Sequence, residues 1–334
     1  MSLLGPDKEW GEYRCMCREF GAVTEAAALA AGRWVGQGDP EAAEAAAVEA
    51  MRAAFAQVPI SGTVVVGKER DPQTSPLAVG SRVGMGGRPT DIVLRALEGA
   101  NIVARGQAGA ISVLTAAAPG NVLQVPEMYM QKIAVGAPAV GKVEMEADIE
   151  QNLEAIADSL GLKVNELTIV VLDRPRHDDL VATLRRAGAR VKLIQDGDVM
   201  ASIAAAIRDS GDHAYIGIGG STEGVISAAA MQCLGGEIVS KFWPLSRREI
   251  EAARERGIED IEATLRTEDL VRGDLVLSAT GVTSGDVLQG VEYRHEGART
   301  QTLVMCTKCR HVRFVETVHS FSPDPKAVAF WKVR

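Results

Sequence analysis

The sequence predicts an α/β protein, because of its size and because helical and strand-type segments alternate in its second half. Its 334 residues exceed what one hydrophobic core usually holds, so one large unit or two closely packed units are expected. From Asp148 onward, helical segments alternate with short apolar strands, which is typical of parallel strands joined by crossover helices. The first half mixes Ala-rich helices with β-branched strands and looks α+β.

The first half is expected to begin with two helices and continue with three strands. Residues 21–57 are Ala-rich with helical spacing, interrupted by WVGQGDP, whose Gly, Asp and Pro suit a turn and a new helix start. Residues 61–67, SGTVVVG, form a β-branched strand that ends at Gly and precedes a polar loop. Residues 90–101 form a strand that runs into a turn, and residues 110–118 form another apolar strand.

Three polar loops in the second half form the candidate binding site. Each follows a strand of the alternating pattern: DRPRH at 173–177, QDGDV at 195–199 and GIGGSTEG at 217–224. Because parallel strands point the same way, these loops should gather along one edge of a sheet. A charged helical stretch at 245–266 and further strands then complete the chain.

The first two loops carry side chains that suit a phosphorylated sugar. Arg174 and Arg176 present guanidinium groups that bind phosphate oxygens in pairs, and surface ion pairs with neighbouring aspartates are the alternative. Asp196 and Asp198 can accept hydrogen bonds from sugar hydroxyls, or one of them caps the following helix. For His177, a role at a helix start or in supporting another residue is favoured over catalysis.

The third loop is suited to an anion. Gly219 and Gly220 come just before a helix, whose first backbone N–H groups and dipole favour negative charge. A plain strand-to-helix turn with Glu223 facing solvent is the alternative interpretation. Together the three loops indicate a sugar-phosphate pocket, without indicating which sugar.

Seven motifs in order along the chain carry a family resemblance: ALAAGRWVGQGD, PEMYMQKIAVG, DRPRH, DGDV, GIGGSTEGVISAA, SATGVTSGDVLQGV and RTQTLVM. They resemble class II fructose-1,6-bisphosphatases, including the cyanobacterial fructose/sedoheptulose bisphosphatases, from about Val23 to His319. The resemblance implies the layered α/β/α/β/α sandwich of the lithium-sensitive sugar phosphatases. It also implies a sugar (bis)phosphate ligand, with Tyr129 among the substrate-binding residues, and a homo-oligomer, either a dimer or a tetramer.

The resemblance also implies a division of the chain. An N-terminal extension would cover residues 1–20, a phosphatase-like α+β half residues 21–147, and an α/β sugar-phosphate-binding half residues 148–334. The first dozen residues lie outside the resemblance.

In that family, carboxylates from four segments bind Mg²⁺ or Mn²⁺ around the scissile phosphate, where the metals activate water and neutralise charge. At the matching positions of this chain, Glu44 and Glu223 keep a carboxylate. The family's GEGE loop reads GKER here, so Lys68 replaces the first carboxylate and Glu69 stands beside it. The lysine of the family's GDKNxAD helix start is also absent, since Pro40 stands there.

The family's DPxEGT motif is the most altered part of the metal site. It reads RALEGA, so Arg95 replaces the bridging aspartate, Glu98 is kept, and Ala100 replaces the threonine that helps to orient the attacking water. At an effective dielectric constant of about 20, two unit charges 4 Å apart interact by about 4 kcal/mol, and twice that when one ion is divalent. Lys68 and Arg95 should therefore repel the metals.

These replacements predict a divergent family member that binds a sugar bisphosphate while ordinary two-metal hydrolysis is weakened or lost, and such a protein needs no cofactor. One alternative is an active Mg²⁺- or Mn²⁺-dependent phosphatase with a metal site rebuilt from Glu44, Glu69, Glu98 and Glu223. A second is that Lys68 forms a Schiff base with a ketose carbonyl; an ion pair of Lys68 with Glu98 or Glu44 is the simpler interpretation. A third is a partner subunit of an active paralogue.

Five cysteines do not suggest a secreted disulfide framework. Cys15 and Cys17 form a CxC and Cys306 and Cys309 a CxxC, so these four thiolates could hold zinc or an iron–sulfur cluster if they meet, although reduced thiols are the simpler expectation. Cys233 is expected to be a small buried apolar residue.

Charge and hydropathy exclude several classes of partner. The net charge of −8 would repel the phosphate backbone of nucleic acid. No apolar stretch reaches membrane-spanning length, and the first residues carry charges where a signal peptide needs an apolar run. A cytoplasmic protein without membrane or nucleic-acid partners is therefore expected.

Overall fold

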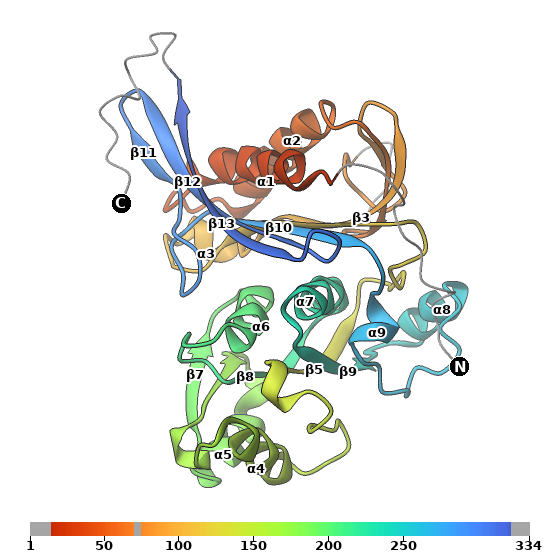
Figure 1. The fold of residues 1–334 in the computed structure, drawn as a ribbon, viewed down its shortest axis with the longest axis vertical. Coiled ribbons are helices and arrows are strands. Elements are labelled where there is room, and N and C mark those ends of the chain that lie inside the picture. The colour runs from red at the N-terminus through yellow and green to blue at the C-terminus, as the bar shows by residue number, and fades with distance from the viewer. Residues whose placement is uncertain (1–14, 70–74, 322–334) are drawn as a thin grey trace.

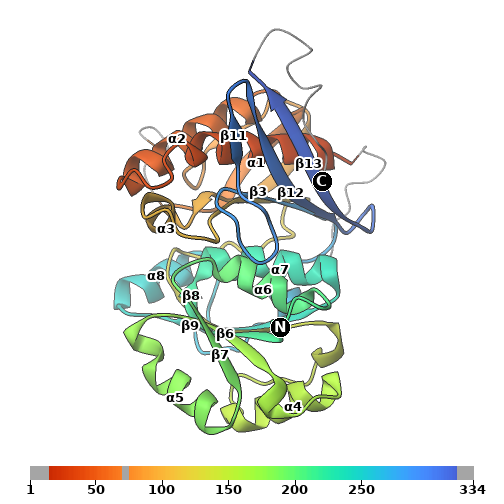
Figure 2. The same ribbon diagram turned by 90° about the vertical axis from the view of Figure 1, so that its left-hand side faces the viewer.

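The computed structural model describes residues 15–69 and 75–321, which form five stacked layers (Figure 1). Six helices form three of the layers: α1 (Cys17–Gly32), α2 (Pro40–Phe55), α4 (Ile149–Leu160), α5 (Asp178–Arg186), α6 (Asp198–Ala206) and α7 (Ser221–Leu234). Helices α1 and α2 cover the outer face of an eight-stranded sheet, and α6 and α7 lie between that sheet and a five-stranded one. Helices α4 and α5 cover the far face of the five-stranded sheet, as the side view in Figure 2 shows. The α/β/α/β/α fold implied by the resemblance is confirmed.

The eight-stranded sheet combines strands from the beginning and the end of the chain. Its members are β1 (Ile60–Val66), β2 (Arg82–Val83), β3 (Arg88–Glu98), β4 (Ile111–Ala117), β10 (Leu275–Gly281), β11 (Glu292–Arg294), β12 (Gly297–Cys306) and β13 (His311–Ser320). The order is β11-β12-β10-β4-β3-β1-β2, and β13 also pairs with β12. Only β1 and β3 are parallel neighbours.

The five-stranded sheet is formed by the middle of the chain. Its strands are β5 (Tyr129–Val135), β6 (Thr168–Leu172), β7 (Arg190–Ile194), β8 (Ala214–Gly220) and β9 (Glu237–Trp243), in the order β7-β6-β8-β5-β9. Strands β6, β7 and β8 are parallel, while β5 and β9 are antiparallel to their neighbours. The three candidate loops therefore follow strands that point the same way, as predicted.

Short helical segments connect these elements. They are α3 (Ala100–Ala104), α8 (Arg247–Glu255), α9 (Thr267–Leu270) and the single 3₁₀ turns Ala137–Ala139, Val164–Glu166 and Pro175–His177. Only the first part of the charged stretch at 245–266 is helical, because α8 ends at Glu255 and Gly257 adopts a positive φ of 81° soon afterwards.

The start of α2 shows how local sequence sets these boundaries. The Asp39 side chain accepts a hydrogen bond of 2.9 Å from the backbone N–H of Ala42, which satisfies one of the free donors of the first turn. Pro40 occupies the first helical position, where its missing N–H costs no hydrogen bond. The helix start expected at the WVGQGDP interruption is therefore formed by this Asp-Pro pair.

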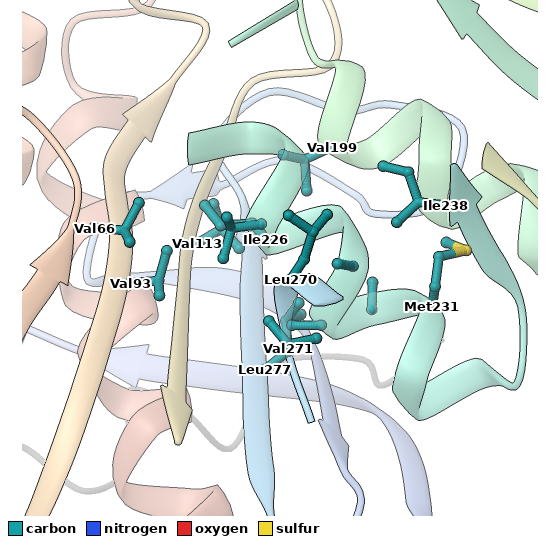
Figure 3. Close-up of a cluster of buried hydrophobic side chains, with 14 of the residues drawn as sticks. Val66, Val93, Val113, Val199, Ile226, Met231, Ile238, Leu270, Val271 and Leu277 are labelled. Carbon is teal, nitrogen blue, oxygen red and sulfur yellow. The ribbon is translucent and has the colours of Figure 1, made fainter. Parts of the chain in front are cut away.

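Three buried clusters hold the layers together. One fills the space between α1, α2 and the eight-stranded sheet, and another lies between the five-stranded sheet and α4 and α5. The largest lies in the middle of the molecule, where Val93 of β3 and Leu277 of β10 share one cluster with Ile226 of α7 and Ile238 of β9 (Figure 3). Helix α7 is thus buried against a sheet on either side.

The sheets divide the chain differently from the expected halves at residues 147 and 148. Strand β5 comes before that boundary but belongs to the five-stranded sheet, and β10 to β13 come after it but complete the eight-stranded sheet. Backbone pairing explains the difference, because β10 lies between β4 and β12 and no local pattern specifies that partner. Within the proposed extension 1–20, α1 already begins at Cys17, and residues 1–14 lie outside the described part.

Among the described residues, none of the helices is both long and apolar enough to cross a membrane.

Replacing Leu277 with Ala should destabilise the protein by about 2–5 kcal/mol, because it leaves a cavity in the central cluster. Leu245 supplies a matched control, since its side chain is 65% exposed and the same change there should stay within about 0.5 kcal/mol. Urea unfolding of both variants measures the difference, and equal losses would contradict this placement of the core.

Candidate functional site

Five charged residues meet where the eight-stranded sheet faces the first turns of α6 and α7. They are Arg95, Glu98, Lys132, Asp198 and Glu223, called here the charged centre. Arg95 and Glu98 come from β3, Lys132 from β5, and the other two from the first turns of the two middle helices. Because buried charges are costly unless they are paired, the contacts within this group decide its chemistry.

Arg95 is held by two carboxylates. Its Nε donates to Glu223 Oε1 at 2.5 Å and its second terminal nitrogen to Oε2 at 3.4 Å, while the first lies 3.2 Å from Glu127 Oε1. Burial works to lower the pKa of Arg95, but the Glu223 and Glu127 carboxylates outweigh it and raise this pKa. For Glu223, burial opposes ionisation, but Arg95 and then Lys132 hold its pKa below the usual value. Both groups are therefore charged and paired.

Glu98 is the least satisfied member of the charged centre. Its Oε1 accepts a 3.3 Å hydrogen bond from the backbone N–H of Val199, and its Oε2 has no hydrogen-bond partner among the described residues. Burial, followed by the nearby Asp198 and Glu223 carboxylates, raises the pKa of Glu98 well above that of an exposed glutamate. Glu98 therefore binds a proton more readily than an exposed glutamate does, and its free oxygen suits a cation.

Lys132 and Asp198 form the other ion pair of the charged centre. Lys132 Nζ lies 2.5 Å from Asp198 Oδ2 and 3.0 Å from the carbonyl oxygen of Gly220, and the lysine is only 1% exposed. Asp198 thus faces a lysine, which differs from the helix-capping alternative. The hydrogen bond that Asp198 was expected to accept from a sugar hydroxyl would have to compete with this buried pair.

Gly219 and Gly220 matter because a larger residue would not fit beside these charges. A Cβ on Gly219 would lie 2.0 Å from Asp198 Oδ2, and a Cβ on Gly220 would lie 2.0 Å from Glu223 Oε2. Both glycines lie at the end of β8, directly before α7. Their absent side chains therefore make room for the charged centre, and the ligand contact expected from the sequence stays a prediction.

Lys68 lies beside the charged centre and forms an ion pair with Glu44. The Lys68 side chain is 34% exposed, and both partners line a cavity of about 620 Å³ between α2, the segment after β1, and β3. Arg95 also lines this cavity. The pairing of Lys68 with Glu44 is the simpler of the sequence-based interpretations of Lys68.

Glu69 lies apart from Glu44, Glu98 and Glu223 and contacts other residues. Its Oε1 lies 2.6 Å from a terminal nitrogen of Arg256 and accepts a 3.0 Å hydrogen bond from the backbone N–H of Glu127. As placed, Glu69 does not join Glu44, Glu98 and Glu223 in a single set.

The predicted substrate-binding residues are only partly brought together. Arg176 donates two hydrogen bonds to the carbonyl oxygen of Ile218, at 3.2 and 2.8 Å, and its guanidinium carbon lies 4.8 Å from the centre of the Tyr129 ring. Arg174 donates to the carbonyl of Asp173 and lines a different, smaller cavity. These arginines follow β6, as expected, but they do not face the Lys68 cavity.

Asp196 lies on another side of the charged centre. It lines a cavity of about 430 Å³ beside the loop that contains Ser284 and Asp286. Burial, followed by the Asp198 carboxylate, raises the pKa of Asp196. This position is compatible with an acceptor for a hydroxyl group.

His177 supports the backbone around the first loop. Its Nε2 accepts a hydrogen bond from the backbone N–H of Ile218 at 2.7 Å, so its Nδ1 is the nitrogen that donates to the carbonyl of Leu172, at 2.8 Å. Burial lowers its pKa, which keeps the ring neutral and this arrangement intact. The geometry agrees with the supporting role that the sequence indicated.

Four of the five cysteines converge. The sulfur atoms of Cys15, Cys17, Cys306 and Cys309 all lie within 4.8 Å of one another. Cys233 lies on α7 and is outside this group.

Three residues that contribute to the site were not singled out from the sequence: Glu127, Lys132 and Arg256. Lys132 had a recognisable signal, because it alternates with Met130 and Ala134 on one buried face of β5. A lysine at such a position needs a buried partner. Glu127 pairs with Arg95, and Arg256 pairs with Glu69, each across a long sequence distance. Neither residue had a comparable signal in the sequence.

Comparison with known proteins identifies the class of protein that this fold and site define. The family described as "Bacterial fructose-1,6-bisphosphatase, glpX-encoded" matches residues 14–319. The chain therefore belongs to the class II fructose-1,6-bisphosphatase family, as the motifs indicated.

Curated relatives carry one shared name, "D-fructose 1,6-bisphosphatase class 2/sedoheptulose 1,7-bisphosphatase". The one from Synechococcus sp. (strain JA-2-3B'a(2-13)) is 43% identical over 326 residues, covering 89% of this chain and 93% of the relative. The one from Synechococcus sp. (strain JA-3-3Ab) is 42% identical with the same coverage. That from Thermosynechococcus vestitus is 38% identical, covering 92% of this chain and 97% of the relative.

The residues present do not fit, as placed, the two-metal set implied by the family. Glu44 already holds Lys68, and Glu223 already holds Arg95. A divalent ion at these carboxylates would meet two cations, each opposing it by several kcal/mol at about 4 Å. Glu98, with its unpartnered oxygen, is the one carboxylate of the charged centre that this arrangement leaves in need of a positive charge or a proton.

Replacing Arg95 with Met should destabilise the protein by about 3–5 kcal/mol near neutral pH, because Glu223 would lose its buried partner. The pKa of Glu223 is now held low, so the pair's stability is present at neutral pH and lost as the pH falls through that pKa. The difference between variant and wild type should therefore shrink toward acid pH. Urea unfolding at several pH values measures this.

Arg52, paired with Glu49 on the surface of α2, supplies the control for Arg95. Its replacement by Met should cause little change at any pH, because exposed pairs contribute little. A loss in the Arg95 variant that is constant with pH would contradict the assigned pairing.

Replacing Gly220 with Ala should destabilise the protein by about 1–3 kcal/mol, because the new Cβ would displace the Glu223 carboxylate. Gly220 has an ordinary φ of −69°, so the effect is steric. Gly21 in α1 is the control: a Cβ there meets Val304 at an ordinary 3.7 Å, and Ala should stabilise the helix by about 0.5–1 kcal/mol. Thermal unfolding should show shifts of opposite sign, and shifts of the same sign would contradict this account.

Proposed function

We propose that this protein binds a sugar bisphosphate of the kind named for its relatives and does not carry out ordinary two-metal hydrolysis. The observation that carries this proposal is the pair of ion pairs, Lys68 with Glu44 and Arg95 with Glu223, at the family's metal-binding carboxylates. In each pair, the lysine or arginine supplies the positive charge that a divalent ion would otherwise supply.

The 620 Å³ cavity supports binding of a phosphorylated ligand. Lys68 and Glu44 are both partly exposed in it, with side chains 34% and 21% exposed, so a ligand phosphate can compete with Glu44 for the ammonium group. Arg95 is more deeply buried and doubly paired, so it fixes Glu223 and is less available to a ligand. In this proposal Lys68 contacts the phosphate, and Arg95 holds the wall of the site.

A second candidate is metal-dependent hydrolysis of fructose 1,6-bisphosphate or sedoheptulose 1,7-bisphosphate. It is favoured by the relatives' shared name at 38–43% identity and by the unpartnered oxygen of buried Glu98, which suits a cation. Glu98, Glu223, Glu44 and, after rearrangement, Glu69 would hold Mg²⁺ or Mn²⁺, which activates water. Such a site requires Lys68 and Arg95 to leave their present partners.

Other sequence-based alternatives have less support. A Schiff base at Lys68 requires a neutral amine, and an ammonium paired with Glu44 is charged. A role as partner of an active paralogue, a homo-oligomeric state and a cytoplasmic location stay predictions.

The decisive experiment measures ligand binding and phosphate release on the same preparations. Wild-type protein with chelator should bind fructose 1,6-bisphosphate in a calorimetric titration, and Lys68→Met should weaken binding about tenfold through loss of one charge-assisted contact.

With Mg²⁺ or Mn²⁺, wild type should release no phosphate, whereas the Lys68→Glu, Arg95→Asp double variant should gain metal-dependent release. Lys142→Glu with Arg105→Asp, both exposed, is the matched control for charge.

Robust metal-dependent release by the wild type would overturn the proposal in favour of the second candidate. Absence of both binding and release, with either bisphosphate, would exclude both.

A further inference from the structure

The four converging cysteines come from the two ends of the described chain. Cys15 lies just before α1, which begins at Cys17. Cys306 is the last residue of β12, and Cys309 lies in the turn between β12 and β13. Cys15 Sγ lies 2.8 Å from Cys17 Sγ and 3.4 Å from Cys306 Sγ, although 291 residues separate the latter pair. The core packing of α1 against β10 and β12 thus brings together thiols that sequence spacing alone could not place.

The β12–β13 turn is shaped to hold two thiolates. Cys306 and His311 are paired across the hairpin, and the backbone N–H of Cys309 points at Cys306 Sγ, with 3.3 Å between nitrogen and sulfur. Arg310 adopts a φ of 53°, a left-handed conformation that residues other than glycine rarely take. This conformation turns the chain back so that both sulfurs of the CxxC lie on one side.

A neighbouring strand anchors the turn. The backbone N–H of Leu275 donates to Thr307 Oγ1 at 2.9 Å, and the backbone N–H of Thr307 donates to the carbonyl of Leu275 at 3.1 Å. Cys306 is 2% and Cys17 9% exposed, so half of the cluster is closed to solvent. The thiols are therefore held in position by the fold.

We propose that Cys15, Cys17, Cys306 and Cys309 bind one zinc ion in a tetrahedral Cys₄ site, separate from the sugar-phosphate site. A zinc–sulfur distance of about 2.3 Å places four sulfurs about 3.8 Å apart in a regular tetrahedron. The observed sulfurs, all within 4.8 Å of one another, need shifts of an ångström or less to reach that arrangement. Four thiolates favour zinc or iron among the common metals, and we assign zinc.

Two features favour a single ion over other uses of these thiols. A cluster of several irons separates its cysteine sulfurs more widely than one ion does, and these sulfurs are tightly grouped. Two disulfides would each require an S–S distance near 2.05 Å and would leave no common centre. All four positions of a tetrahedron are filled by protein, so the site is structural and offers no open position for catalysis.

The ion would fasten the first turn of α1 to the hairpin at the end of β12. Helix α1 packs on the eight-stranded sheet, whose strand β3 carries Arg95 and Glu98. Arg18, Lys308 and Arg310 flank the ligands in sequence and can balance the two net negative charges of zinc with four thiolates. This proposal does not depend on the function proposed for the charged centre.

The test measures metal bound to the full-length protein, purified under reducing conditions without chelator, by plasma mass spectrometry. Wild type and Cys233→Ser should each hold about one zinc per chain, while Cys306→Ser and Cys309→Ser should hold about tenfold less. Cys233 is the matched control, since it is the one cysteine of the five outside the cluster.

A second measurement does not require the variants to fold. Stepwise reaction of native wild type with a mercurial reagent, followed by a zinc indicator, should release about one zinc as the cluster thiols react. Less than about 0.1 zinc per chain after incubation with zinc and removal of the excess would overturn the proposal. Iron in place of zinc, equal zinc loss in the Cys233 variant, or a non-reduced mass lowered by about 2 Da per disulfide would overturn it as well.

Discussion

The position of α6 and α7 between two sheets constrains the whole molecule. A helix covered on both sides must be apolar around most of its circumference, and α7 is buried at every position from Gly224 to Met231. Charged groups are therefore confined to the ends of the middle helices. At the N-terminal end they meet β3, where Arg95 and Glu223 can be buried because they form an ion pair.

Some parts of the site could be predicted from the sequence, and others could not. The layered fold and the three loops after β6, β7 and β8 followed from alternation of apolar segments and from the family motifs. The motifs also predicted that Lys68 and Arg95 stand where the family has metal-binding carboxylates. The partner of Arg95 was not predicted, because Arg95 reaches Glu223 across 128 residues and no local pattern specifies that pair. For Lys68, Glu44 was one of the two partners considered.

Glycines and arginines in the loops show a different limit of sequence reasoning. Gly219 and Gly220 admit Asp198 and Glu223 where a Cβ would collide with them, a steric role that the motif did not indicate. Their contact with a ligand stays a prediction. Arg176 bonds the backbone of β8 and stacks on Tyr129. The motifs thus located these residues, while the contacts of Arg176 and Gly219 depend on other segments of the chain.

The discontinuous eight-stranded sheet has a consequence for how the chain is made. Strands β1 to β4 leave the ribosome early, but β4 receives its neighbour β10 only after some 160 residues of intervening chain, β10 beginning at Leu275. Until then the backbone groups along one edge of β4 have no strand partner and offer a template for wrong pairing. The contiguous five-stranded sheet is complete before that moment. Synthesis therefore provides the five-stranded sheet and the helices on its two faces before the last strands of the eight-stranded sheet emerge.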